Sequence, residues 1–254
     1  MRVTFLGTGA PLHPTRNTMG LLVEAAGCTP LLIDSCGGFE LMRTLAKAGF
    51  KDEQLAELGN IVLTHRHGDH IGGVMALFLA LPNVRLYGPE DALEAATKML
   101  ETTYPHFSPI RGHHVTSTTV RPGKAYHIGG FELSFFAVEH RVPTYAVRVG
   151  LGEKALAFSA DSLPCDALVA CARDADLFIC DALCAATDAS TDAVHALMHP
   201  VAGEAADLAE RAGAKALALT HLARYATPAK MLEQARSSFS GAITIPEDGD
   251  TVEM

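Results

Sequence analysis

One short segment constrains this chain more than any other: residues 64–70, with the sequence THRHGDH. It places three imidazoles and one carboxylate within six positions, directly after the apolar run Asn60-Ile61-Val62-Leu63. A strand that ends in a turn would gather these side chains around one point in space. Because imidazole nitrogens and carboxylate oxygens are ligands that Zn²⁺ prefers, the segment predicts that the chain binds metal.

The spacing within this segment predicts two metal positions. His65 and His67 can share one cation, whereas Asp69 and His70 can reach a second. Two cations need further ligands, and we expect them at the ends of strands, where a rigid element fixes a ligand and leaves an opening for substrate. Three metal-binding side chains follow apolar runs in this way: His140, Asp161 and His221.

The order of the apolar runs predicts two layers of strands between layers of helices. Two sheets packed face to face, with helices outside, would bury amphipathic elements of this kind. The chain has 254 residues and no linker or short repeat, so we expect a single domain over residues 1–254. The expected strands are 3–6, 20–24, 30–34, 61–63, 84–87, several within 115–158, 177–180, 216–219 and 242–245. The expected helices are 39–48, 72–81, 89–99, 163–172, 200–212 and 228–236, and residues 104–114 are expected to form a loop.

Composition and charge limit the partners. The chain has 20 Lys and Arg residues against 29 Asp and Glu, a formal net charge of −9. This balance disfavours general affinity for nucleic acid or an anionic membrane, because binding to a polyanion needs clustered cations. No apolar run is long enough to span a bilayer, and residues 1–7 fit a first strand better than a signal peptide. With six cysteines but no C-x-x-C pair, we expect reduced thiols and a cytoplasmic location.

The candidate ligands, taken in chain order, resemble those of the metallo-β-lactamase superfamily: His65, His67, Asp69, His70, His140, Asp161 and His221. The likeness covers nearly the whole chain and implies an α/β fold, the αββα sandwich of two mixed β-sheets flanked by helices. It also implies a ligand set for each metal. The first metal would be held by His65, His67 and His140. The second would be held by Asp69, His70 and His221, with Asp161 bridging the two.

Local motifs resemble the ribonuclease Z-like branch of that superfamily. They are FLGTG at residues 5–9 with Arg16-Asn17, HRVP at 140–143, and LTH at 219–221 with Arg224-Tyr225. His199 precedes the expected helix from Pro200, at the place where that branch carries an additional catalytic histidine. Asp181 lies where the branch has an acidic partner for that histidine.

The chain also departs from ribonuclease Z proper. That enzyme has a long arm for gripping transfer RNA between the positions that match His140 and Asp161, whereas here the two are 21 residues apart, room for a hairpin only. Asp181 replaces the usual Glu, and Pro200-Val201 replace small hydroxyl residues after His199. The segment from His221 is also one residue shorter than usual. The missing arm and the negative net charge disfavour transfer RNA as the substrate.

The resemblance implies hydrolysis by a metal-bound hydroxide, which Asp69 could orient. His199, oriented by Asp181, is the candidate general acid for the leaving oxygen; the alternative for His199 is a cap on the helix that follows. The leading hypothesis is a phosphodiesterase that acts on a small anionic molecule such as a cyclic nucleotide. The alternative is a hydrolase of a lactone, thioester, sulfate ester or β-lactam at the same dimetal site. We expect two Zn²⁺ ions, with Mn²⁺ and Fe as alternatives.

Two further classes of function are less well supported. A diiron redox protein is disfavoured because redox members of the superfamily usually place an acidic residue where His67 stands. A non-enzymatic RNA-binding relative is disfavoured by the complete ligand set. A homodimer is suggested by analogy alone. His195 is a weaker candidate acid and is expected to be exposed. No metal role is assigned to the remaining histidines: His13, His106, His113, His114 and His127.

Overall fold

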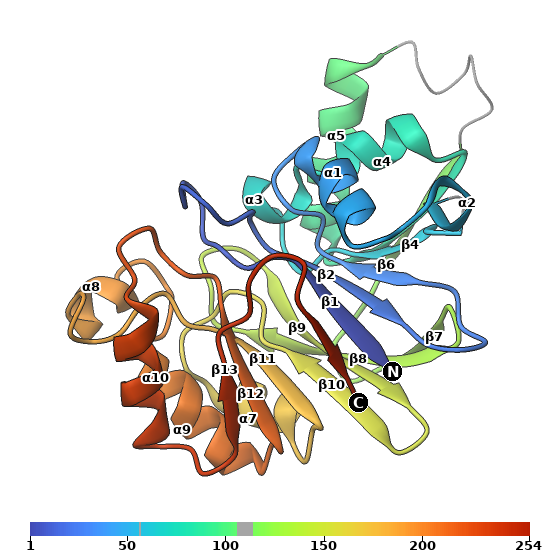
Figure 1. Ribbon diagram of the computed structural model, residues 1–254. Coiled ribbons are helices and arrows are strands. Elements are labelled where there is room, and N and C mark those ends of the chain that lie inside the picture. The colour runs from blue at the N-terminus through green and yellow to red at the C-terminus, as the bar shows by residue number, and fades with distance from the viewer. Residues whose placement is uncertain (56, 106–113) are drawn as a thin grey trace.

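Two mixed β-sheets pack face to face, and helices cover their outer faces (Figure 1). The structure is a computed structural model that describes residues 1–55, 57–105 and 114–254. Seven strands form each sheet within this part of the chain. The arrangement is the αββα sandwich that the resemblance implied, and that prediction is confirmed.

The first sheet has the strand order β14-β1-β2-β3-β4-β5-β6 and is parallel from β3 to β6. Its strands are β1 (Arg2–Gly7), β2 (Gly20–Glu24), β3 (Leu31–Ile33), β4 (Asn60–Val62), β5 (Asn83–Gly88), β6 (His114–Thr119) and β14 (Thr251–Glu253). The helices on its side of the sandwich are α1 (Glu40–Lys47), α2 (Asp52–Leu55), α3 (Gly68–Ile71), α4 (Val74–Ala80) and α5 (Glu90–Thr103).

The second sheet has the strand order β13-β12-β11-β10-β9-β8-β7 and is parallel from β10 to β13. Its strands are β7 (Ala125–Ile128), β8 (Phe131–Val138), β9 (Thr144–Leu151), β10 (Lys154–Phe158), β11 (Leu177–Asp181), β12 (Ala216–Thr220) and β13 (Ala242–Thr244). The helices on this side are α7 (Asp166–Ala172), α8 (Thr191–His195), α9 (Ala202–Ala212) and α10 (Pro228–Arg236).

Three layers of apolar side chains hold the sandwich together. The central layer lies between the sheets and includes Phe5 of the first and Phe135 and Phe158 of the second, each at most 1% exposed. A second layer joins the first sheet to α1, α4 and α5, and a third joins the other sheet to α7, α9 and α10. Removing this apolar surface from water is the main contribution to the stability of such a fold.

Most elements match the sequence-based expectations to within a few residues. The elements that sequence reasoning missed are short, namely α2, α3, α8 and β14. α3 matters most, because the segment after β4 was expected to be a turn but forms a single helical turn that contains Asp69 and His70. A helix of four residues is too short to show a helical period in the sequence.

Two further expectations concern connections and membranes. Most of the loop expected over residues 104–114 lies outside the described residues. The hairpin expected between His140 and Asp161 is present, as the antiparallel pair β9 and β10. Within the described ranges, none of the helices has the length and apolar character needed to cross a membrane.

Candidate metal centre

The candidate ligands gather at one edge of the sandwich because they follow strands that end there. β3 and β4 run parallel in the first sheet, and β10, β11 and β12 run parallel in the second. Asp34 and His221 come directly after β3 and β12, His65 and Asp161 come three residues after the ends of β4 and β10, and Asp181 is the last residue of β11. β8 runs in the same direction as β10, because both are antiparallel to β9, and His140 follows it. Strands that run in the same direction bring their ends to the same edge.

Three imidazole nitrogens converge in the first group. Nδ1 of His67 lies 3.1 Å from Nε2 of His65 and 3.2 Å from Nε2 of His140. Oδ2 of Asp161 lies 3.7 Å from the same nitrogen of His65 and 4.0 Å from that of His140. All four ligand atoms are within 4.8 Å of one another. A neutral imidazole has one nitrogen lone pair to offer, so this convergence suits a cation better than mutual hydrogen bonds.

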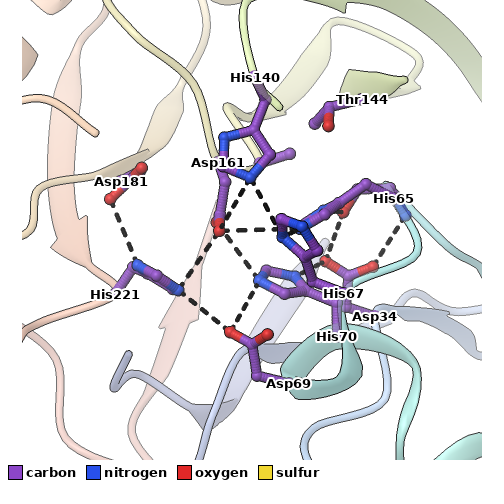
Figure 2. A network of polar contacts seen from close by, with 12 residues as sticks. Asp34, His65, His67, Asp69, His70, His140, Thr144, Asp161, Asp181 and His221 are labelled. Carbon is purple, nitrogen blue, oxygen red and sulfur yellow. Dashed lines mark hydrogen bonds and ion pairs between the residues drawn. The ribbon is translucent and has the colours of Figure 1, made fainter. Parts of the chain in front are cut away.

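The second group shares Asp161 with the first. Oδ2 of Asp69 lies 3.4 Å from Nε2 of His70 and 3.4 Å from Nε2 of His221. Asp161 places Oδ1 3.3 Å from His70 and Oδ2 3.5 Å from His221. Figure 2 shows Asp161 between the two groups, with contacts to His140 on one side and to His70 and His221 on the other. Its carboxylate is therefore placed to bridge two cations.

Unsatisfied polar atoms support this assignment. Nε2 of His70 and Oδ1 of Asp161 are buried and make no hydrogen bond in the described part of the chain, although they lie 3.3 Å apart. Buried polar atoms nearly always have a partner, and a divalent cation would supply one here. The donor sets, imidazole nitrogen with carboxylate oxygen, suit Zn²⁺. The residues present therefore fit the two metal ions that the fold family implies.

The electrostatics of the second group also favour a bound cation. Burial by itself lowers the pKa of His221, but the charge of Asp161 and contacts with Asp181 and Asp69 raise that pKa to about 10. Burial likewise opposes protonation of His70, yet Asp161 and Asp34 raise its pKa well above the usual value. Sites that stabilise a proton on imidazole also stabilise a metal ion, which displaces that proton when it binds.

In the first group the pKa values of the histidines are lowered instead of raised. Burial lowers the pKa of His65 well below its usual value, and the neighbouring His70 adds to the effect. Burial also lowers the pKa of His67 and of His140. These three rings therefore stay neutral, which is the form that binds metal. The carboxyl of Asp161 stays ionised: burial raises its pKa, but His221 and His70 lower it well below the usual range.

Asp181 links His199 to the second group. Its Oδ2 atom lies 2.6 Å from Nδ1 of His199, and its Oδ1 atom lies 3.6 Å from Nδ1 of His221. The two imidazole rings stack with centroids 4.8 Å apart. Burial lowers the pKa of His199, but the charge and hydrogen bond of Asp181 outweigh it and raise that pKa. The carboxylate thus orients the ring of His199 through a hydrogen bond and lies within ion-pair distance of His221.

The side chain of His199 does not cap the following helix. α9 begins at Ala202, and its N-terminal turn is closed by the carboxylate of Glu204, which accepts from the backbone N–H of Val201 at 3.0 Å. Both carboxylate oxygens of Glu204 also lie 2.9 Å from Nε2 of His195, whose side chain is 36% exposed. His195 thus pairs with a helix-capping carboxylate and belongs to neither metal group.

Asp34 is the buried residue of this site that sequence reasoning missed. Its Oδ2 atom lies 2.7 Å from Nδ1 of His70 and accepts from Oγ1 of Thr64 at 2.8 Å. Oγ1 of Thr64 in turn lies 3.0 Å from Nδ1 of His65. Asp34 therefore orients a ligand of each group, one directly and one through Thr64. The signal that could have found it is its place directly after the apolar run of β3.

The backbone is strained around the same site. Seven non-glycine residues of the described chain have positive φ, and they include Asp34 at 54°, Ala160 at 54° and His221 at 61°. Such conformations cost energy and persist where the surrounding structure enforces them. Here they set the direction in which the chain leaves β3, β10 and β12, and so aim the carboxylates and imidazoles inward.

The remaining histidines that the structure describes, His13, His114 and His127, belong to neither metal group. Nδ1 of His13 accepts from the backbone N–H of Arg16 at 3.1 Å, which folds the loop after β1. His114 begins β6 and His127 lies in β7. His106 and His113 lie outside the described residues.

Sequence comparisons agree with this geometry. A model of the beta-lactamase superfamily domain matches residues 29–222. Ribonuclease Z from Myxococcus xanthus is 30% identical over an alignment of 311 residues, which covers 100% of this chain and 98% of that protein. The probable metallo-hydrolase YhfI from Bacillus subtilis is 28% identical over 260 residues, and the alignment covers 98% of each chain.

Structural comparisons point the same way. The crystal structure of the metallo-beta-lactamase fold protein YhfI has a TM-score of 0.83, at 26% identity and with 99% of each chain covered. The short form of human tRNase Z has a TM-score of 0.76 at 24% identity, with 100% of this chain and 99% of that chain covered, and shares the fold. Since the matched domain contains all of the strand ends described above that carry candidate ligands, the chain belongs to the metallo-β-lactamase superfamily as a ribonuclease Z-like member.

Proposed function

We propose that this protein is a dinuclear-metal-dependent phosphodiesterase that acts on small phosphodiesters. The observation that carries the proposal is the Asp181–His199 pair, 2.6 Å apart and stacked against His221 of the second group. An alkoxide is a poor leaving group, so a positioned acid beside the metal groups benefits phosphodiester cleavage in particular. The coarser statement, a metal-dependent hydrolase, rests on the family and on the two ligand groups.

The side chains divide the work between them. Bound divalent cations would polarise a phosphoryl oxygen and lower the pKa of the attacking water. Asp69 directs Oδ2 to His70 and His221, which leaves Oδ1 to accept a hydrogen bond from that water. His199 donates its Nδ1 proton to the hydrogen bond with Asp181, so the proton for the leaving oxygen would come from Nε2.

We propose Zn²⁺ as the metal in both groups. Five of the seven ligands are histidines, and imidazole nitrogen suits zinc better than magnesium or calcium. Each group takes ligands from both sheets: His65 and His67 with His140, and His70 with His221. For that reason we also propose that residues 1–254 act as one domain.

Three observations support a small substrate over transfer RNA. The segment between His140 and Asp161 holds only the β9–β10 hairpin. The alignment with the Myxococcus xanthus ribonuclease Z is 57 residues longer than this chain, whereas the alignment with YhfI is 260 residues long. The chain therefore lacks segments that this ribonuclease carries, and its net charge of −9 disfavours a polyanion.

The test is hydrolysis of bis(p-nitrophenyl) phosphate beside a carboxylic nitrophenyl ester and a lactone, with metal content measured on the same sample. We expect phosphodiester turnover with about two zinc ions per chain. Turnover of the ester or lactone without phosphodiester turnover would overturn the proposal in favour of the alternative hydrolase. Cleavage of precursor transfer RNA in preference to small phosphodiesters would overturn the proposal that the substrate is small.

A further inference from the structure

A pocket beside the metal groups has an unusually apolar rim. Four large hydrophobic side chains are exposed in the described part of the chain, and three of them line this one pocket: Leu12 at 86%, Leu197 at 49% and Tyr225 at 47%. The pocket has a volume of about 430 Å³ and is also lined by His199 and His221. Clustered exposed apolar groups next to polar ones are typical of binding sites.

The pocket is built from separate segments that backbone hydrogen bonds hold together. The N–H of Ala10 donates to the carbonyl of Leu222 at 2.9 Å, which fixes the loop of Leu12 to the segment after β12. The N–H of Ala223 donates to the carbonyl of Leu183 at 2.8 Å, which ties that segment to the one after β11. The pocket walls are therefore in place before any substrate binds.

Two strained residues present the apolar rim. Leu12 has φ of 66° and Met198, between Leu197 and His199, has φ of 70°. Neither is glycine, so both conformations cost energy. The strained backbone occurs at or next to two leucines, Leu12 and Leu197, whose side chains are exposed to solvent. That combination points to a ligand-binding role.

Arg224 adds a cation to the same pocket. Its side chain is exposed, and its guanidinium makes no hydrogen bond or ion pair with any residue that the structure describes. It is therefore available to an anionic group of a ligand. The pocket thus offers a planar aromatic ring, aliphatic surface and one cation, all beside the candidate acid.

We infer that this pocket holds the part of the substrate that carries the leaving oxygen, and that this part is a nucleoside, so that the substrate class is a small phosphodiester of a nucleoside. The inference rests on the proposed function. A base would lie against Tyr225 and the rim leucines, since bases stack on aromatic side chains irrespective of their identity. The adjacent His199 would then meet the leaving oxygen of that nucleoside.

The experiment compares substrates that differ only in the base. The four nucleoside 2′,3′-cyclic phosphates are set against methyl riboside 2′,3′-cyclic phosphate, which has the same scissile bond and no base. For at least one nucleoside we expect kcat/KM to exceed that of the methyl riboside by about tenfold or more. Leu12→Ser and Leu197→Ser should each lower the ratio of kcat/KM for that nucleoside substrate to kcat/KM for the methyl riboside toward one. Phe39→Ser, which removes the fourth exposed hydrophobic side chain and does not line the pocket, should keep it.

A binding measurement needs no turnover. The nucleoside of the best substrate, without its phosphate, should bind the wild-type protein about tenfold more tightly than either leucine variant by calorimetry. A ratio near one for all four bases, with the methyl riboside hydrolysed, would overturn the inference and leave the phosphodiesterase proposal intact. Equal nucleoside binding in wild type and both variants would also overturn it. Failure to hydrolyse any phosphodiester, bis(p-nitrophenyl) phosphate included, would overturn the proposed function itself.

Discussion

Asp34 and His70, 36 residues apart in the chain, meet in the interior with Oδ2 2.7 Å from Nδ1. Both side chains are fully buried. The carboxylate holds the ring of His70 so that Nε2 faces Asp161 and Asp69. A metal-binding histidine whose second nitrogen is fixed in this way has a defined orientation and tautomer.

Replacing Asp34 by Asn should weaken metal binding while the seven direct ligands remain. Loss of such an outer carboxylate typically lowers metal affinity by about 10- to 100-fold. Zinc affinity, measured by competition with a chelator, is the direct test. An unchanged affinity in a variant that remains folded by circular dichroism would show that Asp34 only supports the fold.

Asp161→Ala should remove the bridging carboxylate and empty at least one metal position. We expect activity to fall by orders of magnitude, because the two groups share this residue. Metal content per chain is the decisive measurement. Asp176→Asn is a matched control, since this carboxylate lies just before the opposite end of β11 and should leave the metal content unchanged. Full metal occupancy in Asp161→Ala would contradict the bridging role.

The candidate ligands stand out in the sequence because each follows an apolar strand, whereas their contacts with one another do not. β3 pairs with β4 in a register that places Ile33 opposite Val62, and so brings Asp34 beside Thr64. The register of strand pairing depends on how whole sheets pack, and one amino-acid sequence alone does not reveal it. The fold was predictable because apolar runs mark most of its strands and helices, and because the order of the candidate ligands resembles that of the metallo-β-lactamase superfamily. The turn of α3 and the rim of Leu12, Leu197 and Tyr225 depend on tertiary contacts between distant loops.

His199→Ala should keep both metal ions and lose the general acid. Substrates with alkoxide leaving groups should slow by about 100-fold or more, whereas nitrophenyl esters, whose leaving group needs no proton, should slow far less. His195→Ala is the matched control, because His195 pairs with Glu204 and should leave the ratio of the two rates unchanged. Equal slowing of both substrate types in His199→Ala would contradict the acid role.

The carboxylate of Asp176 should make stability depend on pH in the acid range. Burial by itself would raise its pKa, but hydrogen bonds from Lys215 and from the backbone N–H of Ala155, with the charge of Lys154, lower it to about 2. A lowered pKa means that the ionised form stabilises the folded state above the unfolded pKa of about 4. That contribution is lost as the pH falls from about 4 to about 2.

Asp176→Asn should therefore reduce the free energy of unfolding near neutral pH by about 1 kcal/mol, after allowance for solvent screening of its partly exposed lysine partners. The difference from wild type should shrink steadily below about pH 4. Urea unfolding at a series of pH values measures it. Asp166→Asn breaks a comparable but exposed pair with Arg211, in which the Asp166 side chain is 94% exposed, and should change stability little at any pH. A difference for Asp176→Asn that stays constant with pH would mean that the lost hydrogen bonds, and not the charge, account for it.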